Sequence, residues 1–167
     1  MSRLATYLND HLGGSTGGLE LVKRASRSNG GNEYGPVLAE LAREIEEDRN
    51  ALLELMAELD VGRDRVKVLA GWAGEKAGRL KPNGSLVSYS PLSRLIEIEG
   101  LVIGVTGKLS LWENLREILG DRVGGVDLVE LAERARSQRA RLDALRAAAA
   151  PEALAGDGGP IRRAGDS

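Results

Sequence analysis

The fold is decided by residues 36–60, which read PVLAELAREIEEDRNALLELMAELD. Apolar side chains recur in this stretch at steps of three and four residues, the spacing that places them on one face of an α-helix. They are Leu38, Leu41, Ile45, Leu52, Leu55 and Leu59. Asp48 takes the position in this stripe between Ile45 and Leu52. We therefore expect a helix over this stretch that carries a carboxylate on its buried face.

The same spacing recurs in four other segments, which are therefore also expected to be helices. These segments cover residues 2–28, 64–80, 91–119 and 128–150. The chain has two Trp, three Tyr and no Phe, and a Leu-rich composition with few aromatic residues favours helix over sheet. Asp127 is expected to cap the last helix. Residues 101–105, LVIGV, have a composition that also suits a short strand, which is the competing interpretation there.

The predicted fold class is all-α: an up-down four-helix bundle with an additional C-terminal helix. We expect a single domain over residues 1–150, because a chain of 167 residues suits one hydrophobic core. Pro151 is expected to end the last helix, and Gly, Pro and charged residues follow it. Residues 151–167 are therefore expected to form a disordered tail.

Composition excludes several classes of function. The chain has no Cys, which excludes disulfides, Cys-ligated zinc and thiol catalysis, and its single His, His11, excludes sites that need two. A net charge of −2 gives no global reason to expect nucleic acid or an anionic membrane as a partner. Neither a membrane-spanning apolar run nor a signal-peptide core is visible. We expect a cytoplasmic protein without a cofactor.

Acidic residues on the helix over residues 36–60 are the most informative candidates for a site. Glu44, Glu47 and Asp48 share one helix face, and this face overlaps the apolar stripe. Carboxylates that point into a bundle need a cation, a proton or a hydrogen-bond donor. We expect a salt-bridged polar layer formed by His11, Glu44, Asp48, Lys76 and Lys108. The alternative is a carboxylate metal site, which two nearby lysines disfavour by repelling a divalent cation.

The sequence EIEED within this helical pattern resembles the ferritin-like superfamily. Metal-binding members carry Glu on the first and third bundle helices and Glu-x-x-His on the second and fourth. The matching positions in residues 1–119 are Glu20, Glu44, Glu47, Glu75 and Glu97. Glu47 and Gly100 stand where the two His should be, so the resemblance implies a ferritin-like bundle without a di-iron site. The alternative function is a carboxylate-bridged iron or manganese protein that uses the five Glu.

Other motifs are weaker. Gly104–Lys108 (GVTGK) is similar to part of a phosphate-binding loop, but Val102 and Leu109 stand where that motif needs Gly and Ser or Thr. The glycines of residues 13–18, GGSTGG, predict a kink, an anion-binding turn or a notch for a crossing helix. With Trp72 and Trp112 they could also line a small-molecule pocket. A nucleophile at Ser15 or Ser110 would need a base, and only His11 is available.

The expected function is a non-catalytic one, structural or in protein interaction. The C-terminal helix must bury its Leu stripe on its own bundle or on a second copy of the chain, and the second option predicts a homodimer through that helix. Its local charge between residues 130 and 146 is too mild for strong phosphate binding.

Overall fold

The computed structural model describes residues 2–64 and 89–155. Within these ranges the chain is mostly helical, which confirms the all-α class. The helices are α1 (Arg3–Ser28), α2 (Tyr34–Glu58), α4 (Pro91–Leu119) and α5 (Leu128–Ala155). Apart from Asp64, the helix predicted over residues 64–80 lies outside the described residues, and so does most of the predicted tail.

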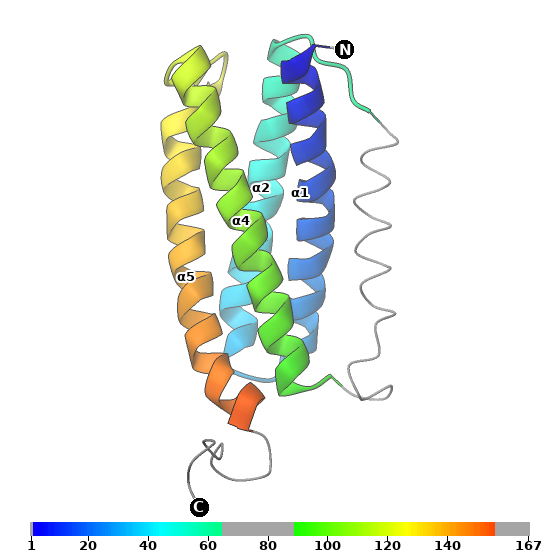
Figure 1. Ribbon diagram of the computed structural model, residues 1–167, viewed down its shortest axis with the longest axis vertical. Coiled ribbons are helices and arrows are strands. Elements are labelled where there is room, and N and C mark those ends of the chain that lie inside the picture. The colour runs from blue at the N-terminus through cyan, green and yellow to red at the C-terminus, as the bar shows by residue number, and fades with distance from the viewer. Residues whose placement is uncertain (1, 65–88, 156–167) are drawn as a thin grey trace, which may run out of the picture.

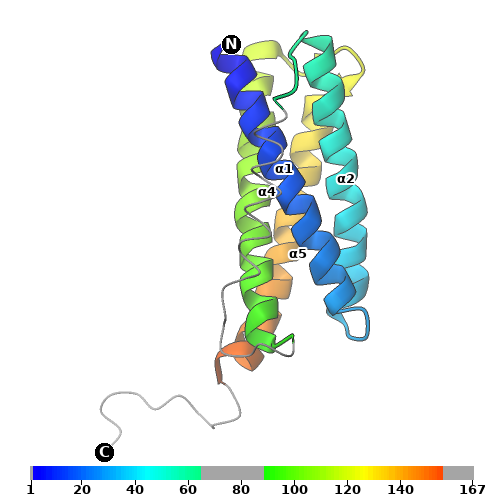
Figure 2. The ribbon, with the colours of Figure 1, turned by 90° about the vertical axis from the view of Figure 1, so that its right-hand side faces the viewer.

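The four helices lie side by side as an elongated bundle (Figures 1 and 2). In Figure 1, α1 descends from the N-terminus, α2 and α4 both ascend, and α5 descends. The neighbouring pairs are α1 with α2, α1 with α4, α4 with α5, and α2 with α5. The α1–α2 and α4–α5 pairs are therefore antiparallel hairpins, whereas α2 and α4 run in the same direction. No helix in the described part of the chain is long and apolar enough to cross a membrane.

The turn between α1 and α2 depends on Asn29 and Gly35. Asn29 is fully buried, and its side chain donates to the Ala25 carbonyl oxygen and accepts from Asn32. A Cβ atom at position 35 would clash with the carbonyl oxygen of Asn29, so only glycine allows this close approach. Helix α2 consequently starts at Tyr34, two residues earlier than predicted.

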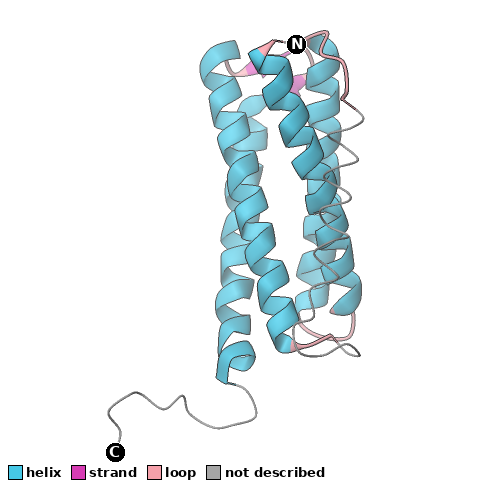
Figure 3. Cartoon of the chain, turned by 45° about the vertical axis from the view of Figure 1, so that its right-hand side comes forward, coloured by secondary structure: helices cyan, strands magenta, loops and turns pink. Residues whose placement is uncertain are grey.

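Helix α1 is continuous through its glycines, so the predicted kink does not interrupt it. Helix α4 likewise continues through residues 101–105, and the competing strand interpretation is wrong. The short strands β1 (Arg122–Val123) and β2 (Val126–Asp127) form an antiparallel pair between α4 and α5, visible at one end of the bundle in Figure 3. Asp127 accepts from the backbone N–H groups of Val129 and Glu130, which confirms the predicted cap.

Helix α5 differs from its prediction in its end and in its role. It runs through Pro151 to Ala155, and Figure 1 shows its last part bending at this end. Ala149 is buried and Ala153 packs against the same apolar cluster, so tertiary contact outweighs the hydrogen bond that Pro151 cannot donate.

The core consists of two apolar clusters, one toward each end of the bundle, and α5 contributes to both. Leu128, Leu131 and Ala135 belong to one cluster, and Leu142 and Ala149 to the other. The expectation that this helix is an addition to a completed core is therefore corrected: α5 is one of the helices that form the core. Its Leu stripe is buried on its own chain, so this stripe no longer argues for the predicted homodimer, which stays a prediction.

Candidate functional site

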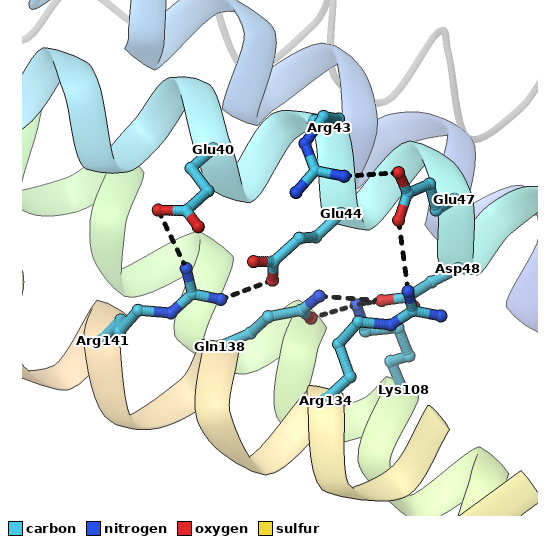
Figure 4. Close-up of polar contacts among 9 residues, drawn as sticks. All are labelled: Glu40, Arg43, Glu44, Glu47, Asp48, Lys108, Arg134, Gln138 and Arg141. Atoms are coloured by element: carbon cyan, nitrogen blue, oxygen red, sulfur yellow. Dashed lines mark hydrogen bonds and ion pairs between the residues drawn. The ribbon is translucent and has the colours of Figure 1, made fainter. Parts of the chain in front are cut away.

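A buried carboxylate lies at the centre of the bundle, between the two apolar clusters. Asp48 of α2 is 1% exposed and has partners from two other helices (Figure 4). Lys108 of α4 donates to its Oδ2 atom, and Gln138 of α5 donates to the same oxygen at 3.0 Å. The Nε atom of Arg134 lies 2.8 Å from Oδ1 as an ion pair, although its N–H is not aligned for a hydrogen bond. Both oxygens of the carboxylate therefore face cationic groups.

Gln138 orients the pair of charges. It is fully buried, its amide oxygen accepts from Lys108, and its amide nitrogen donates to Asp48. Burial lowers the pKa of Lys108, and the negative charge of Asp48 offsets part of this effect. The ammonium group is thus held in the interior by a carboxylate and an amide, the arrangement that a buried charge requires.

A second layer of ion pairs surrounds this centre on the α2–α5 side (Figure 4). Arg141 donates to Glu44 and lies 3.5 Å from Glu40, while Arg134 donates to Glu47 at 3.2 Å. Burial raises the pKa of Glu44, but the hydrogen bonds from Arg141 and Gln138 and the charge of Arg141 outweigh it. The pKa of this carboxyl group therefore lies below its ordinary value. We call Asp48, Lys108, Arg134, Gln138, Glu44 and Arg141 the ion cluster.

The residues predicted for the polar layer are brought together only in part. Asp48 contacts Lys108, and Glu44 lies one turn away in the same cluster. His11 is not part of it: its ring packs edge-on against Tyr7, with ring centroids 4.6 Å apart. Lys76 lies outside the described residues.

Sequence reasoning missed Arg134, Gln138 and Arg141, because α5 was expected to stand outside the core. The sequence nevertheless contains a signal for these three residues. These three side chains recur at steps of four and three residues, interleaved with the apolar positions Leu131, Ala135 and Leu142. Polar residues at that spacing on the buried face of a helix indicate partners inside the bundle.

The Glu residues of the metal alternative are separated. Glu44 pairs with Arg141, and Glu47 pairs with Arg43 and Arg134. Glu97 lies toward the other end of α4, where it pairs with Arg24 and accepts from the Tyr89 hydroxyl. Glu20 joins neither group in any ion pair recorded for the described residues, and Glu75 lies outside them. Within residues 2–64 and 89–155, no three acidic or His side chains form a group that could hold a metal ion.

An open groove lies beside Lys108, between α1, α2 and α4. Its volume is about 320 Å³, and Trp112, Asp48 and Lys108 are among the side chains that line it. Five glycines also line it: Gly14 and Gly18 from α1, and Gly100, Gly104 and Gly107 from α4. His11 lies at the same groove, and burial lowers its pKa more than the charge of Asp10 raises it. We call this feature the glycine groove.

The weaker motifs fall within helices. The Ser15 hydroxyl donates to the Leu12 carbonyl oxygen at 2.8 Å, and the Ser110 hydroxyl donates to that of Thr106 at 3.2 Å. Both hydroxyls are therefore satisfied by their own helices. Residues 104–108 lie inside α4, where the backbone N–H groups are used by the helix and cannot wrap a phosphate.

Comparisons of the chain with protein-family models, with curated proteins and with solved structures found no match.

Proposed function

We propose that this chain is a non-catalytic helical-bundle protein with a structural or protein-interaction role. In this proposal the ion cluster takes the place that a metal site occupies in related bundles. The ion cluster would specify which helices pair, because a buried charge is stable only beside a group of opposite charge.

The observation that carries the proposal is the set of partners around Asp48. Lys108 and Gln138 both donate to one carboxylate oxygen, and Arg134 lies 2.8 Å from the other. Two cationic side chains already neutralise the carboxylate, and they would repel a divalent cation by the same charge. This argues against the carboxylate-bridged iron or manganese alternative.

The direction of the helices supports a ferritin-like arrangement as the finer description of the fold. Ferritin-like bundles have one long connection between two helical hairpins. Here α1 and α2 form one hairpin, α4 and α5 form the other, and α2 and α4 run the same way (Figure 1). The resemblance is architectural, and fold alone does not carry function.

Metal analysis tests the proposal directly. We expect less than stoichiometric iron or manganese in the purified protein, and no rise in melting temperature when Fe(II) or Mn(II) is added anaerobically. The variant Glu44→Gln is the matched control, because it removes the charge of one of the five candidate Glu ligands and keeps the shape of the side chain. Stoichiometric metal in the wild type that is lost in Glu44→Gln would contradict the proposal in favour of the metal protein.

The interaction role has its own test in the predicted homodimer. Because α5 forms part of the core, removing it would unfold the chain, so its outer face must be altered instead. Ala140 is exposed on α5, and Ala140→Arg would block a contact between two copies there. Light scattering at several concentrations should report a dimer for the wild type and a monomer for the variant. Identical masses for the two would exclude this helix face as the dimer contact.

A further inference from the structure

The glycine groove extends along two neighbouring helices. On α4 its lining runs from Gly100 to Trp112, which is about 18 Å along the helix axis. Gly14 and Gly18 of α1 line it together with Gly107 of α4. A Cβ atom added at any of these three would meet no atom of the described residues within 4 Å beyond the backbone of its own helix. The absent side chains therefore leave a long open space beside the described helices.

Aliphatic side chains line much of this groove. They are Ile45 and Leu52 of α2, and Leu101, Ile103, Val105 and Leu111 of α4. The volume of about 320 Å³ falls in the range of small-molecule sites. It corresponds to about ten non-hydrogen atoms, if each takes the roughly 30 Å³ that a water molecule occupies in the liquid. The lining and the volume together favour a small occupant with an aliphatic body.

A buried donor at the groove lacks an acceptor. Trp112 is 1% exposed and lines the groove, and its indole N–H has no hydrogen-bond partner among the described residues. A buried N–H without a partner costs free energy, which is why such groups are rare in folded proteins. An occupant of the groove that carries an oxygen acceptor would remove this cost.

Arg49 of α2 lines the same groove and joins no ion pair recorded for the described residues. Its Nε atom donates to the Thr16 hydroxyl at 3.4 Å, which is a long hydrogen bond to a neutral group. Arg43 on the same helix, in contrast, pairs with Glu47. A planar guanidinium group binds a carboxylate through two parallel hydrogen bonds, so this position favours an anion over a neutral molecule.

The other charged side chains at the groove oppose an anion only weakly. Lys108 and Asp48 contact each other, so their charges offset one another (Figure 4). Asp10 lies six residues before Thr16 on α1, which is about 9 Å along the helix. This is close to the screening length of physiological salt, so most of its repulsion is screened. An anion beside Arg49 therefore meets little opposing charge.

We propose that the glycine groove binds a medium-chain aliphatic carboxylate, with its chain along the glycines of α1 and α4 and its carboxylate on Arg49. Octanoate, with eight carbon and two oxygen atoms, matches the volume of about ten non-hydrogen atoms. One such molecule carries an anion for Arg49 and an oxygen acceptor of the kind that Trp112 lacks. An alcohol of the same length carries the acceptor without the charge, and an alkane carries neither.

Isothermal titration of the full chain with octanoate and with 1-octanol tests the class of ligand. We expect one octanoate per chain, bound at least about tenfold more tightly than octanol, because only the carboxylate forms a charge-assisted hydrogen bond with Arg49. Arg49→Gln should remove this preference and leave the binding of octanol unchanged. The matched control Arg43→Gln alters an exposed arginine of the same helix and should keep the preference.

A second variant tests the place of the aliphatic chain. Gly18→Leu puts a side chain into the open space, so the binding of octanoate should fall below detection. The melting temperature should stay the same or rise, since Leu favours a helix more than Gly does. Ala140→Leu adds an apolar side chain at an exposed position of α5 and should leave the binding unchanged.

A measurement on the wild type keeps the test valid if Gly18→Leu folds poorly. The indole N–H resonance of Trp112, assigned by its absence in Trp112→Phe, should move downfield as octanoate saturates the chain. A resonance that does not move would overturn the proposal, and so would the absence of octanoate binding up to millimolar concentration. Equal affinity of the wild type for octanoate and octanol would reject the carboxylate, and octanoate binding that survives in folded Gly18→Leu would reject the groove.

Discussion

The two sides of Lys108 differ in the residues that surround it. Toward α2 and α5 the interior contains charges, and each of Asp48 and Lys108 has two or more polar partners. Toward α1 the interior contains glycines, and a Cβ atom added at Gly14, Gly18, Gly104 or Gly107 would meet no atom of the described residues within 4 Å beyond the backbone of its own helix. One side is filled by charged and amide side chains of the described residues, and the other is an open groove.

The difference shows how each side specifies its neighbour. A buried charge tolerates only a partner of opposite sign in the right place, so the ion cluster selects α5 by chemistry. The five glycines of the groove contribute no side chains, so they leave space there and supply no charged partner. Charges therefore define which helices meet at the ion cluster. At the groove, the glycines of α1 and α4 define an open space.

The largest expected effect tests the charged side. Asp48→Ala should lower the free energy of unfolding by about 3 kcal/mol or more, because it leaves Lys108 and Arg134 facing each other without a carboxylate. Urea denaturation followed by circular dichroism measures this change. A loss within about 0.5 kcal/mol would mean that the carboxylate stabilises nothing, and the contrast between the two sides would disappear.

The next effect concerns Asn9, near the start of α1. Asn9 is fully buried and its side chain makes three hydrogen bonds, to Ala5, Gly62 and Asp64. Asn9→Ala should cost roughly 1–3 kcal/mol, because it removes all three hydrogen bonds of a fully buried side chain. Asn50→Ala, on the exposed face of α2, is the matched control and should be close to neutral. Equal losses of unfolding free energy in the two variants would argue against a special role for Asn9.

A smaller effect, dependent on pH, is expected at Glu44. Its pKa in the folded chain lies below the ordinary value of 4.5, so the folded state favours the ionised form. The resulting stability is present above pH 4.5 and is lost as the pH falls through the folded pKa. Between pH 7 and pH 3, the wild type should therefore lose more unfolding free energy than Glu44→Gln. Parallel losses in urea titrations at these two pH values would remove Glu44 from the ion cluster.

The smallest effect is expected for an ion pair outside the cluster. Arg43 and Glu47 lie 2.5 Å apart on α2, but their side chains are 63% and 45% exposed. Solvent screens such a pair, so Arg43→Ala should change the unfolding free energy by no more than about 0.5 kcal/mol. The comparison with Asp48→Ala on the same helix isolates the effect of burial. A loss as large as that of Asp48→Ala would show that position inside the bundle is not what matters.

Much of the fold follows from local pattern. The spacing of Leu residues predicts α1, α2, α4 and α5, and Asp127 predicts the start of the last helix. Asp48 is recognisable as a buried carboxylate because it interrupts an apolar stripe. The end of α5 is not predictable in this way, since Pro151 argues locally for a stop, and only the contacts of Ala149 and Ala153 carry the helix further.

The partners in the ion cluster are harder to predict than its centre. Lys108 is predicted from its place beside its own apolar stripe. His11 is predicted by the same reasoning, yet its ring packs against Tyr7 and not against Asp48. Which cation meets Asp48 depends on how the helices are rotated and stacked, and periodicity within one helix carries no information on that.

The sequence by itself determined which residues form helices, which face of each is apolar and that one carboxylate must be buried, because these properties arise from neighbours three and four positions apart. Only the tertiary structure decided that α5 completes the core, that Gln138 and Arg134 join Lys108 around Asp48, and that glycines of α1 and α4 face one groove. These depend on contacts between residues from 30 to about 90 positions apart, such as Lys108 with Gln138 and Asp48 with Gln138. The chain reaches them only when whole helices pack.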